Sequence, residues 1–181
     1  MKRIATGIVI FLLCSCSQKQ NNTSSEGAVT AEQPDQESWG VFLVLSREGI
    51  KTAEVRTGHT RTFSARNVSE LSDSVVADFY NERGLHTSRL TALEAAIDDN
   101  KQIMLARKNV VVVSDSANAT LKTSELSYDE QQEKIYTDKF ITFITRTDTI
   151  YGYGFESDRS LNHYIIKNIS GSVSRIINKK Q

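Results

Sequence analysis

The chain has 181 residues, with 22 basic and 22 acidic side chains, so its formal net charge is zero. Hydrophobic residues make up 39% of the chain and charged residues 24%, which is typical of a globular domain and excludes a wholly disordered chain. This balance of charge gives no electrostatic reason to expect a nucleic-acid partner.

Residues 1–15 have the pattern of a bacterial lipoprotein signal peptide. Two basic residues precede an apolar run over residues 4–13, which is too short to cross a bilayer as a helix. The string Leu13-Cys14-Ser15-Cys16 has a small residue directly before its second cysteine. We therefore predict that Cys16 is lipidated. A disulfide between the two cysteines, or two chance cysteines in a cleaved leader, is the alternative.

A diacylglyceryl group and an N-acyl chain such as palmitate on Cys16 would hold the chain on a membrane, because each buried methylene contributes about 0.8 kcal/mol. Residues 16–38 are rich in Gln, Asn, Ser, Thr and Glu and cannot bury a core, so they are predicted to form a flexible tether. No cysteine follows Cys16, so a domain beyond it has no disulfide. Cleavage of the signal peptide would remove Lys2 and Arg3 and leave 20 basic side chains against 22 acidic ones. The mature chain would therefore have a formal charge of −2.

A single domain is predicted over residues 39–181. Trp39 is expected to cap its core, and an apolar strand or edge element is expected directly after it. Val110–Val113 is β-branched at every position, which predicts a segment that is buried on both faces or lies at the centre of the fold. Further short strands are predicted between turn residues, at residues 53–56, 60–65, 75–80 and 85–91.

A unit of about 30 residues recurs three times in the second half, and each copy reads as strand, acidic turn, strand. The copies cover residues 90–112, 121–143 and 150–173, and they align Asp98, Asp129 and Asp158 as turn residues. Stacked hairpins bury a continuous apolar face that one copy could not bury alone. The repeat predicts an all-β fold: an elongated, twisted β-jelly roll of stacked antiparallel hairpins with an interior groove.

A helix is the alternative for the first copy. Leu90, Leu93, Ile97 and Met104 fall near helical spacing in an alanine-rich stretch. The aligned second copy has strand-forming Thr, Tyr, Ile and Phe there, and the string 98–100 falls where a hairpin turn is needed. We therefore favour strands.

Catalysis finds little support in the sequence, and we predict no catalytic residue, cofactor or metal site. His59, His86 and His163 lie in separate segments without ligand spacing, and the acidic pairs at 98–99 and 129–130 occupy turn positions.

Three strings resemble the O-glycosylation acceptor pattern of Bacteroidetes, a match that is common by chance in a chain rich in Ser and Thr: residues 73–75, 115–117 and 148–150.

The strings LSDSVVADFYNERGLHTSRLTALEAAIDDN, KIYTDKF and GYGFESD resemble the LptC family, the periplasmic component of the lipopolysaccharide export ABC transporter, in its Bacteroidetes-type forms. The resemblance covers the chain from Trp39 to about residue 177. It implies a V-shaped jelly roll whose apolar trough takes the acyl chains of lipopolysaccharide from the inner-membrane transporter. The lipid then passes to an LptA-like periplasmic bridge protein.

Residues expected to line the trough are Phe79, Val110, Val112, Ile141, Phe143, Tyr153 and Phe155, with Phe63 and Ile103 as further candidates. For each of them ordinary core packing is the alternative. In residues 151–155 the aromatic residues alternate with glycine, which predicts that Tyr151, Tyr153 and Phe155 face inward. The resemblance also implies that edge strands pair with partner jelly rolls. The residues expected in the carboxyl-terminal edge are Tyr164, Ile166, Ile169, Val173 and Ile176.

One departure from the family concerns the anchor, because many members use a transmembrane helix where this chain has a lipoprotein signal. We expect the periplasmic face of the inner membrane, although Ser17 after the lipidated cysteine would direct an enterobacterial lipoprotein to the outer membrane. The alternative function is a structural or protein-interaction lipoprotein on a similar β scaffold. A sealed interior favours that alternative, and an open apolar slot favours lipid transfer.

Overall fold

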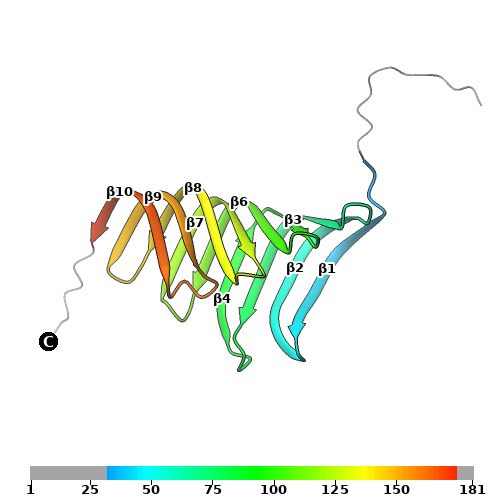
Figure 1. Cartoon of the computed structure of the whole chain (residues 1–181), viewed down its shortest axis with the longest axis horizontal. Coiled ribbons are helices and arrows are strands. Elements are labelled where there is room, and N and C mark those ends of the chain that lie inside the picture. The colour runs from blue at the N-terminus through cyan, green and yellow to red at the C-terminus, as the bar shows by residue number, and fades with distance from the viewer. Residues whose placement is uncertain (1–31, 175–181) are drawn as a thin grey trace, which may run out of the picture. The chain divides into compact units, whose positions relative to one another are not determined.

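The computed structural model describes residues 32–174, which form one antiparallel β-sheet of ten strands (Figure 1). The strands are β1 (Gln36–Arg47), β2 (Ile50–Phe63), β3 (Val68–Tyr80), β4 (His86–Ala92), β5 (Glu94–Asp98), β6 (Ile103–Ser114), β7 (Ala119–Asp129), β8 (Lys134–Ile144), β9 (Asp148–Asp158) and β10 (Tyr164–Ser174). Neighbours follow the order β1-β2-β3-β4-β6-β7-β8-β9-β10, with β5 paired to β3 and β6. The all-β prediction is confirmed, and β1 and β10 are the two free edges of the sheet.

The predicted repeat corresponds to three hairpins: β5–β6, β7–β8 and β9–β10. Residues 90–104 contain the end of β4, all of β5, a turn over residues 99–102 and the start of β6, so the helix alternative is wrong for this segment. Sequence periodicity alone favoured a helix there, whereas alignment with the second copy gave the correct answer.

The aligned aspartates close the hairpin turns by accepting backbone hydrogen bonds. Asp98 Oδ1 accepts from the N–H of Lys101 at 3.0 Å, and Asp129 Oδ1 accepts from the N–H of Gln132 at 2.9 Å. Asp158 Oδ1 accepts two such bonds in the last turn, each at 3.0 Å. The backbone role predicted for these acidic positions is confirmed.

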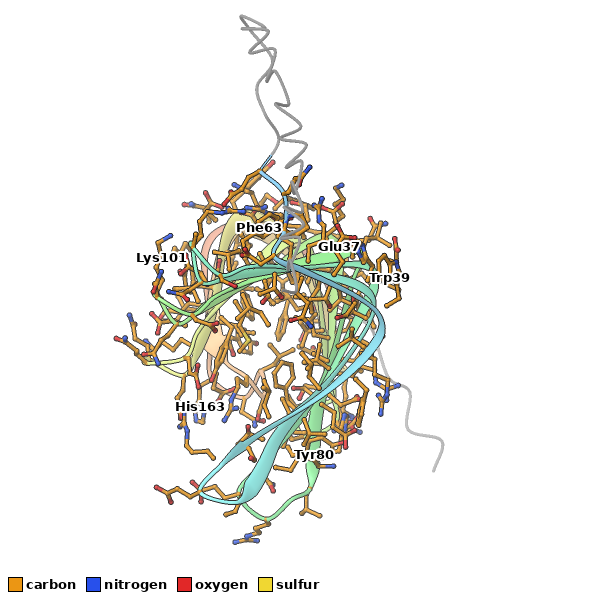
Figure 2. The ribbon with its side chains drawn as sticks, turned by 90° about the vertical axis from the view of Figure 1, so that its right-hand side faces the viewer. Glu37, Trp39, Phe63, Tyr80, Lys101 and His163 are labelled. Carbon is orange, nitrogen blue, oxygen red and sulfur yellow. The ribbon has the colours of Figure 1, made fainter. Side chains whose placement is uncertain are left out.

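An irregularity crosses the sheet near the middle of every long strand, and we call it the fold line. Pairing is interrupted at adjoining places in neighbouring strands, and several of these residues have positive φ. Bulges bend a strand, so each long strand contributes one half to each of two facing layers (Figure 2). The fold line runs through Gly40, Gly58, Asp73, Ser74, Leu93, Lys108, Asn109, Asp138, Lys139 and Gly154.

Gly58 shows why the fold line requires a small residue. A Cβ atom at this position would lie 2.5 Å from the backbone oxygen of Asp73, closer than two such atoms can approach. The two strand runs predicted at residues 53–56 and 60–65 are the two halves of β2 on either side of this glycine.

One row of apolar residues runs across the inner face of one layer. Register pairs join Leu43, Val55, Ala77, Leu90, Val112, Leu121, Phe143 and Ile150 in sequence, one residue per strand. The core therefore lies between the two layers, and the other face of the sheet meets solvent. Because only one face of the sheet is covered, burial on both faces is wrong for Val110–Val113, and a capping role is wrong for Trp39. Val113 is 43% exposed beside the buried Val112, and Trp39 is 69% exposed and stacks on His59 instead of capping the core (Figure 2).

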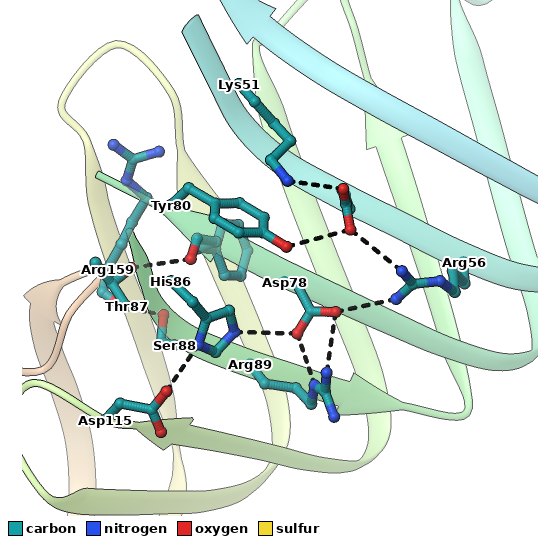
Figure 3. Close-up of polar contacts among 12 residues, drawn as sticks. Lys51, Arg56, Asp78, Tyr80, His86, Thr87, Ser88, Arg89, Asp115 and Arg159 are labelled. Carbon is teal, nitrogen blue, oxygen red and sulfur yellow. Dashed lines mark hydrogen bonds and ion pairs between the residues drawn. The ribbon is translucent and has the colours of Figure 1, made fainter. Parts of the chain in front are cut away.

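A buried carboxylate joins β2, β3 and β4 on the outer face of the sheet (Figure 3). Asp78 is 2% exposed and accepts hydrogen bonds from Arg89 Nε at 2.6 Å and Arg56 Nη1 at 3.0 Å. His86 Nε2 lies 3.1 Å from the same carboxylate, and its Nδ1 lies 2.7 Å from Asp115. Burial raises the pKa of Asp78, but the hydrogen bonds from Arg89, His86 and Arg56 together bring it below the ordinary value.

We expect Asp78→Asn to lower the free energy of unfolding at pH 7 by about 1–3 kcal/mol, because Arg56 and Arg89 lose a charged acceptor. The folded pKa of Asp78 lies below the unfolded value, so its contribution is present above about pH 4 and is lost as the pH falls through the folded value. Urea denaturation of both proteins from pH 7 to pH 2.5 measures this, and the difference between them should shrink in acid. The matched control is Asp138→Asn, an exposed carboxylate paired only with Lys139. A difference that stays constant with pH would refute this role for Asp78.

Candidate functional site

An apolar cavity of about 70 Å³ lies between the two layers. Its walls are almost entirely hydrocarbon and come from both layers: Val55, Val75, Ala77, Phe79, Leu90 and Val112 from one, and Leu71, Ala95, Ile97, Met104, Ala106, Leu126, Tyr128 and Ile135 from the other. The cavity therefore offers room to an apolar chain and almost no hydrogen-bond partner to water.

Small side chains leave this space open. Ala77, Ala95 and Ala106 occupy inward positions of β3, β5 and β6, where larger residues would fill the gap. The buried residues accordingly form two hydrophobic clusters, one centred on β2 and β3 and one running from β4 to β9, and Leu90 packs against both.

Aromatic rings fill the interior toward β10. The centroids of Phe143 and Phe155 lie 5.3 Å apart, and Tyr164 lies 4.4 Å from the first of them. Phe143 and Phe155 are fully buried, at 0% exposure. We call these three residues the aromatic plug. The cavity thus reaches from β2 to Ile135 of β8, and aromatic rings fill the interior beyond it, toward β10.

The predicted trough residues divide into three groups. Phe79 and Val112 line the cavity. Val110, Ile141, Phe143 and Phe155 are buried in the packed core beside it, and Phe63 is also buried, with Ile103 partly so. Tyr153 is 52% exposed and contacts Phe140 on the outer face, with ring centroids 5.2 Å apart.

The inward placement predicted for Tyr153 is wrong because the strand does not keep a simple alternation. Gly154 has a φ of +76°, and the pairing of β9 with β8 shifts between Tyr153 and Phe155. This bulge places Tyr153 outside and Phe155 inside. Tyr151 lies on the outer side as well, with its ring stacked at 6.5 Å on Phe140.

The cavity continues into a partly polar hollow of about 410 Å³. This hollow lies at the ends of the strands that are farthest from the fold line. Phe79, Met104 and Tyr128 line both spaces. Arg159 stands at their junction, with its guanidinium carbon 5.7 Å from the centre of the Tyr128 ring. Burial raises the pKa of Tyr128, so its phenol stays neutral. We call this junction the mouth.

Two sets of contacts cross between the layers at the free ends. Arg47 Nη1 lies 2.7 Å from Glu133 Oε1 across the partly polar hollow. The buried hydroxyls of Ser88 in β4 and Ser114 in β6 donate to backbone oxygens of the β9–β10 turn. The acceptors are Arg159, at 2.9 Å, and Ser160, at 2.5 Å. The turn that carries Arg159 is therefore fastened to β4 and β6.

Sequence reasoning missed most of the cavity wall and the whole mouth. The alanines of the cavity wall are too small to stand out in the sequence as lining residues. Alignment of the repeat copies together with the strand registers could have placed Ala95 and Ala106 on the inner face. Arg159 was overlooked as an ordinary turn residue. No local pattern signals its contact with Ser88, because the two residues are 71 positions apart.

The free edges carry exposed apolar side chains. On β1 these are Trp39, Phe42 and Val44, at 69, 54 and 52% exposure. On β10 they are Ile165, Ile169 and Val173, at 62, 64 and 57%. Of the predicted edge residues, Tyr164 contacts the core through its ring, as part of the aromatic plug, but remains 41% exposed, and Ile166 packs against the main hydrophobic cluster. Ile176 lies outside the described residues, as do Cys16 and the signal-peptide and tether predictions up to residue 31.

The histidines contact different carboxylates at separate places: His59 with Glu37, and His163 with Asp158. Within residues 32–174 no three His, Cys, Asp or Glu side chains gather as a metal ion would need. The same part of the chain holds no helix long and apolar enough to span a membrane.

A single antiparallel sheet folded over an apolar cavity, with both of its edge strands free within residues 32–174, is the architecture of a β-jelly roll. The chain matches the family described as lipopolysaccharide-assembly, LptC-related, over residues 7–168, and it belongs to that family. It therefore has a role in lipopolysaccharide transport, in a family of periplasmic, inner-membrane-associated transport components and not of enzymes. No match was found among curated proteins.

We expect Phe143→Ala to lower the free energy of unfolding by about 3–5 kcal/mol, because it empties a fully buried position in the aromatic plug. Tyr153→Ala removes a comparable ring from the exposed face and should cost less than about 1 kcal/mol. Urea denaturation of the two variants measures this contrast. Equal losses would show that Phe143 is not the core residue described.

Proposed function

We propose that the cavity receives acyl chains of lipopolysaccharide from the inner-membrane ABC transporter and that the chain passes the lipid to an LptA-like bridge protein. The observation that carries this proposal is the apolar cavity between the two layers. An acyl chain of about a dozen methylenes exposed to water costs on the order of 10 kcal/mol, so a carrier must keep it covered during transfer.

The arrangement of surfaces suits an amphiphile. The apolar cavity borders the partly polar hollow, so a chain can lie inside while its polar part stays in contact with water. The cavity is large enough for part of one acyl chain, and the adjoining hollow offers space for more of it. A fully packed interior would have favoured a purely structural or interaction lipoprotein, which is the alternative function, and the cavity speaks against it.

We further propose that the two free edges bind the partners by strand addition. Each edge strand presents unpaired backbone groups beside exposed apolar side chains, neither contains proline, and β10 carries a single charged residue, Lys167. The resemblance assigns one edge to the jelly roll of the transporter and β10 to the bridge protein.

The proposal includes an anchor on the periplasmic face of the inner membrane. A signal peptide over residues 1–15, lipidated Cys16 and a tether over residues 16–38 would hold the domain of residues 39–181 there. In the described part of the chain, β1 already begins at Gln36, ahead of Trp39. Sorting to the outer membrane is the alternative location.

Photocrosslinking with a small diazirine side chain at Val112 tests the carrier proposal. Val112 lines the cavity and is 2% exposed, whereas the adjacent Val113 is 43% exposed on the opposite face and is the matched control. In cells that express the full chain, we expect lipopolysaccharide adducts at Val112 and none at Val113. Added bridge protein should reduce the Val112 adduct.

A cavity-filling variant gives a second measurement. Ala106→Leu places three further carbon atoms in the hollow interior, so we expect it to reduce crosslinking from the diazirine at Leu90 while the fold is retained. Circular dichroism checks the fold. Absence of lipid adducts at Val112, Leu90 and Phe79 alike would refute the carrier proposal and leave an interaction module.

The edge proposal predicts that Ile169→Lys together with Val173→Lys abolishes binding of the bridge protein, because charges on an edge strand oppose strand pairing. The control is Phe140→Lys, which places a charge on an exposed aromatic position away from the edge. Pull-down from cells that express the full chain measures the effect. Loss of binding in the control and not in the edge variant would place the bridge protein on the outer face.

A further inference from the structure

Two arginines near the mouth stand out because they have no acidic partner within residues 32–174. Most of the described arginines form ion pairs with carboxylates, for example Arg47 with Glu133 and Arg61 with Glu70. Arg83 and Arg159 do not, although a guanidinium ion keeps its charge at any physiological pH. Their charges are therefore available to an anion.

Both arginines line the same space. A polar hollow of about 350 Å³ is bordered by Tyr80, Glu82, Arg83, Thr87, Arg159 and Ser160. Glu82 is the one carboxylate among these lining residues, so the two guanidinium ions outnumber it. Arg159 also lines the apolar cavity, and it thereby joins a positively charged hollow to an apolar one.

The position of Arg159 is fixed before any ligand arrives. The Ser88 hydroxyl holds its backbone oxygen at 2.9 Å, the Ser114 hydroxyl holds that of the next residue at 2.5 Å, and its guanidinium lies over the Tyr128 ring. Figure 3 shows its side chain extending from the contact with Ser88 past Thr87 and Tyr80. The backbone of Arg159 is thus held in place, and its guanidinium already rests on a ring, so the side chain loses less conformational entropy on binding than a free one would.

We propose that Arg159, assisted by Arg83, binds the anionic group of the amphiphile whose apolar chain lies in the cavity. The recognised group is a phosphate or a carboxylate, because a guanidinium ion donates two parallel hydrogen bonds to either. The inference rests on the carrier function proposed above and deepens it: the mouth selects anionic amphiphiles over neutral ones.

Isothermal titration calorimetry on the full chain in amphipol tests this selection with three probes. Octyl phosphate and octyl glucoside, both below their critical micelle concentrations, share one chain and differ in headgroup charge, and inorganic phosphate lacks the chain. We expect octyl phosphate to bind most tightly. Arg159→Gln should weaken the binding of octyl phosphate about tenfold or more, because a charge-assisted contact is lost. The affinity for octyl glucoside should stay unchanged.

Two further variants keep the test independent of folding. Arg83→Gln alters an exposed turn and should weaken the binding of octyl phosphate by a smaller factor than Arg159→Gln does. Arg146→Gln removes another arginine that has no acidic partner within residues 32–174, in the β8–β9 turn away from the mouth, and should change nothing. Thermal unfolding verifies that all variants fold.

The outcomes separate the two proposals. If wild-type protein binds both octyl compounds equally and neither Arg159→Gln nor Arg83→Gln matters, the anionic site is refuted while the carrier function stands. If inorganic phosphate alone binds as tightly as octyl phosphate, the hollow is a site for free phosphate and the proposed amphiphile site is refuted. If neither octyl compound binds, the carrier function fails and this inference fails with it.

Discussion

A single sheet has two faces, and this one must cover its apolar face without help from a second sheet or from helices within the described residues. It does so by bending every long strand at the fold line, so that the sheet becomes its own covering layer. The row from Val55 to Phe143 then faces the other half of the same strands. Cavity, mouth and free edges all follow from this one constraint, because a sheet that folds without closing into a barrel keeps both edges.

Stability is supplied differently at the two ends of the interior. Near β10 the aromatic plug fills the space and contributes buried apolar surface. Around β2–β4 the interior is hollow, and less packing is available there. On the outer face of those same strands, the buried Asp78 accepts hydrogen bonds from Arg56 and Arg89 and fixes the strand alignment from outside. The polar network thereby braces the strands whose inner face borders the cavity.

The sequence was informative where structure is local or repeated, and uninformative where it depends on distant contacts. Hairpins and turn aspartates could be predicted because each copy of the repeat carries its own turn signal. Tyr153 was misplaced because one bulge at Gly154 reverses the alternation, and Val113 because β-branching alone does not report which faces are covered. Arg159 could not be identified as a site residue, since its role depends on hydroxyls far away in the chain.

The direction of the backbone hydrogen bonds has a further consequence for how this interior can change size. Ladder bonds join neighbouring strands within each layer, and none of them spans the gap between the layers. Separation of the layers about the fold line would therefore break side-chain contacts and no strand pairing. The contacts that oppose it are the aromatic plug, the hydroxyl bonds of Ser88 and Ser114 to the β9–β10 turn, and the exposed ion pair of Arg47 and Glu133, of which the exposed pair is the weakest. The hollow part of the interior thus widens at a lower cost in free energy than the part that the aromatic plug fills.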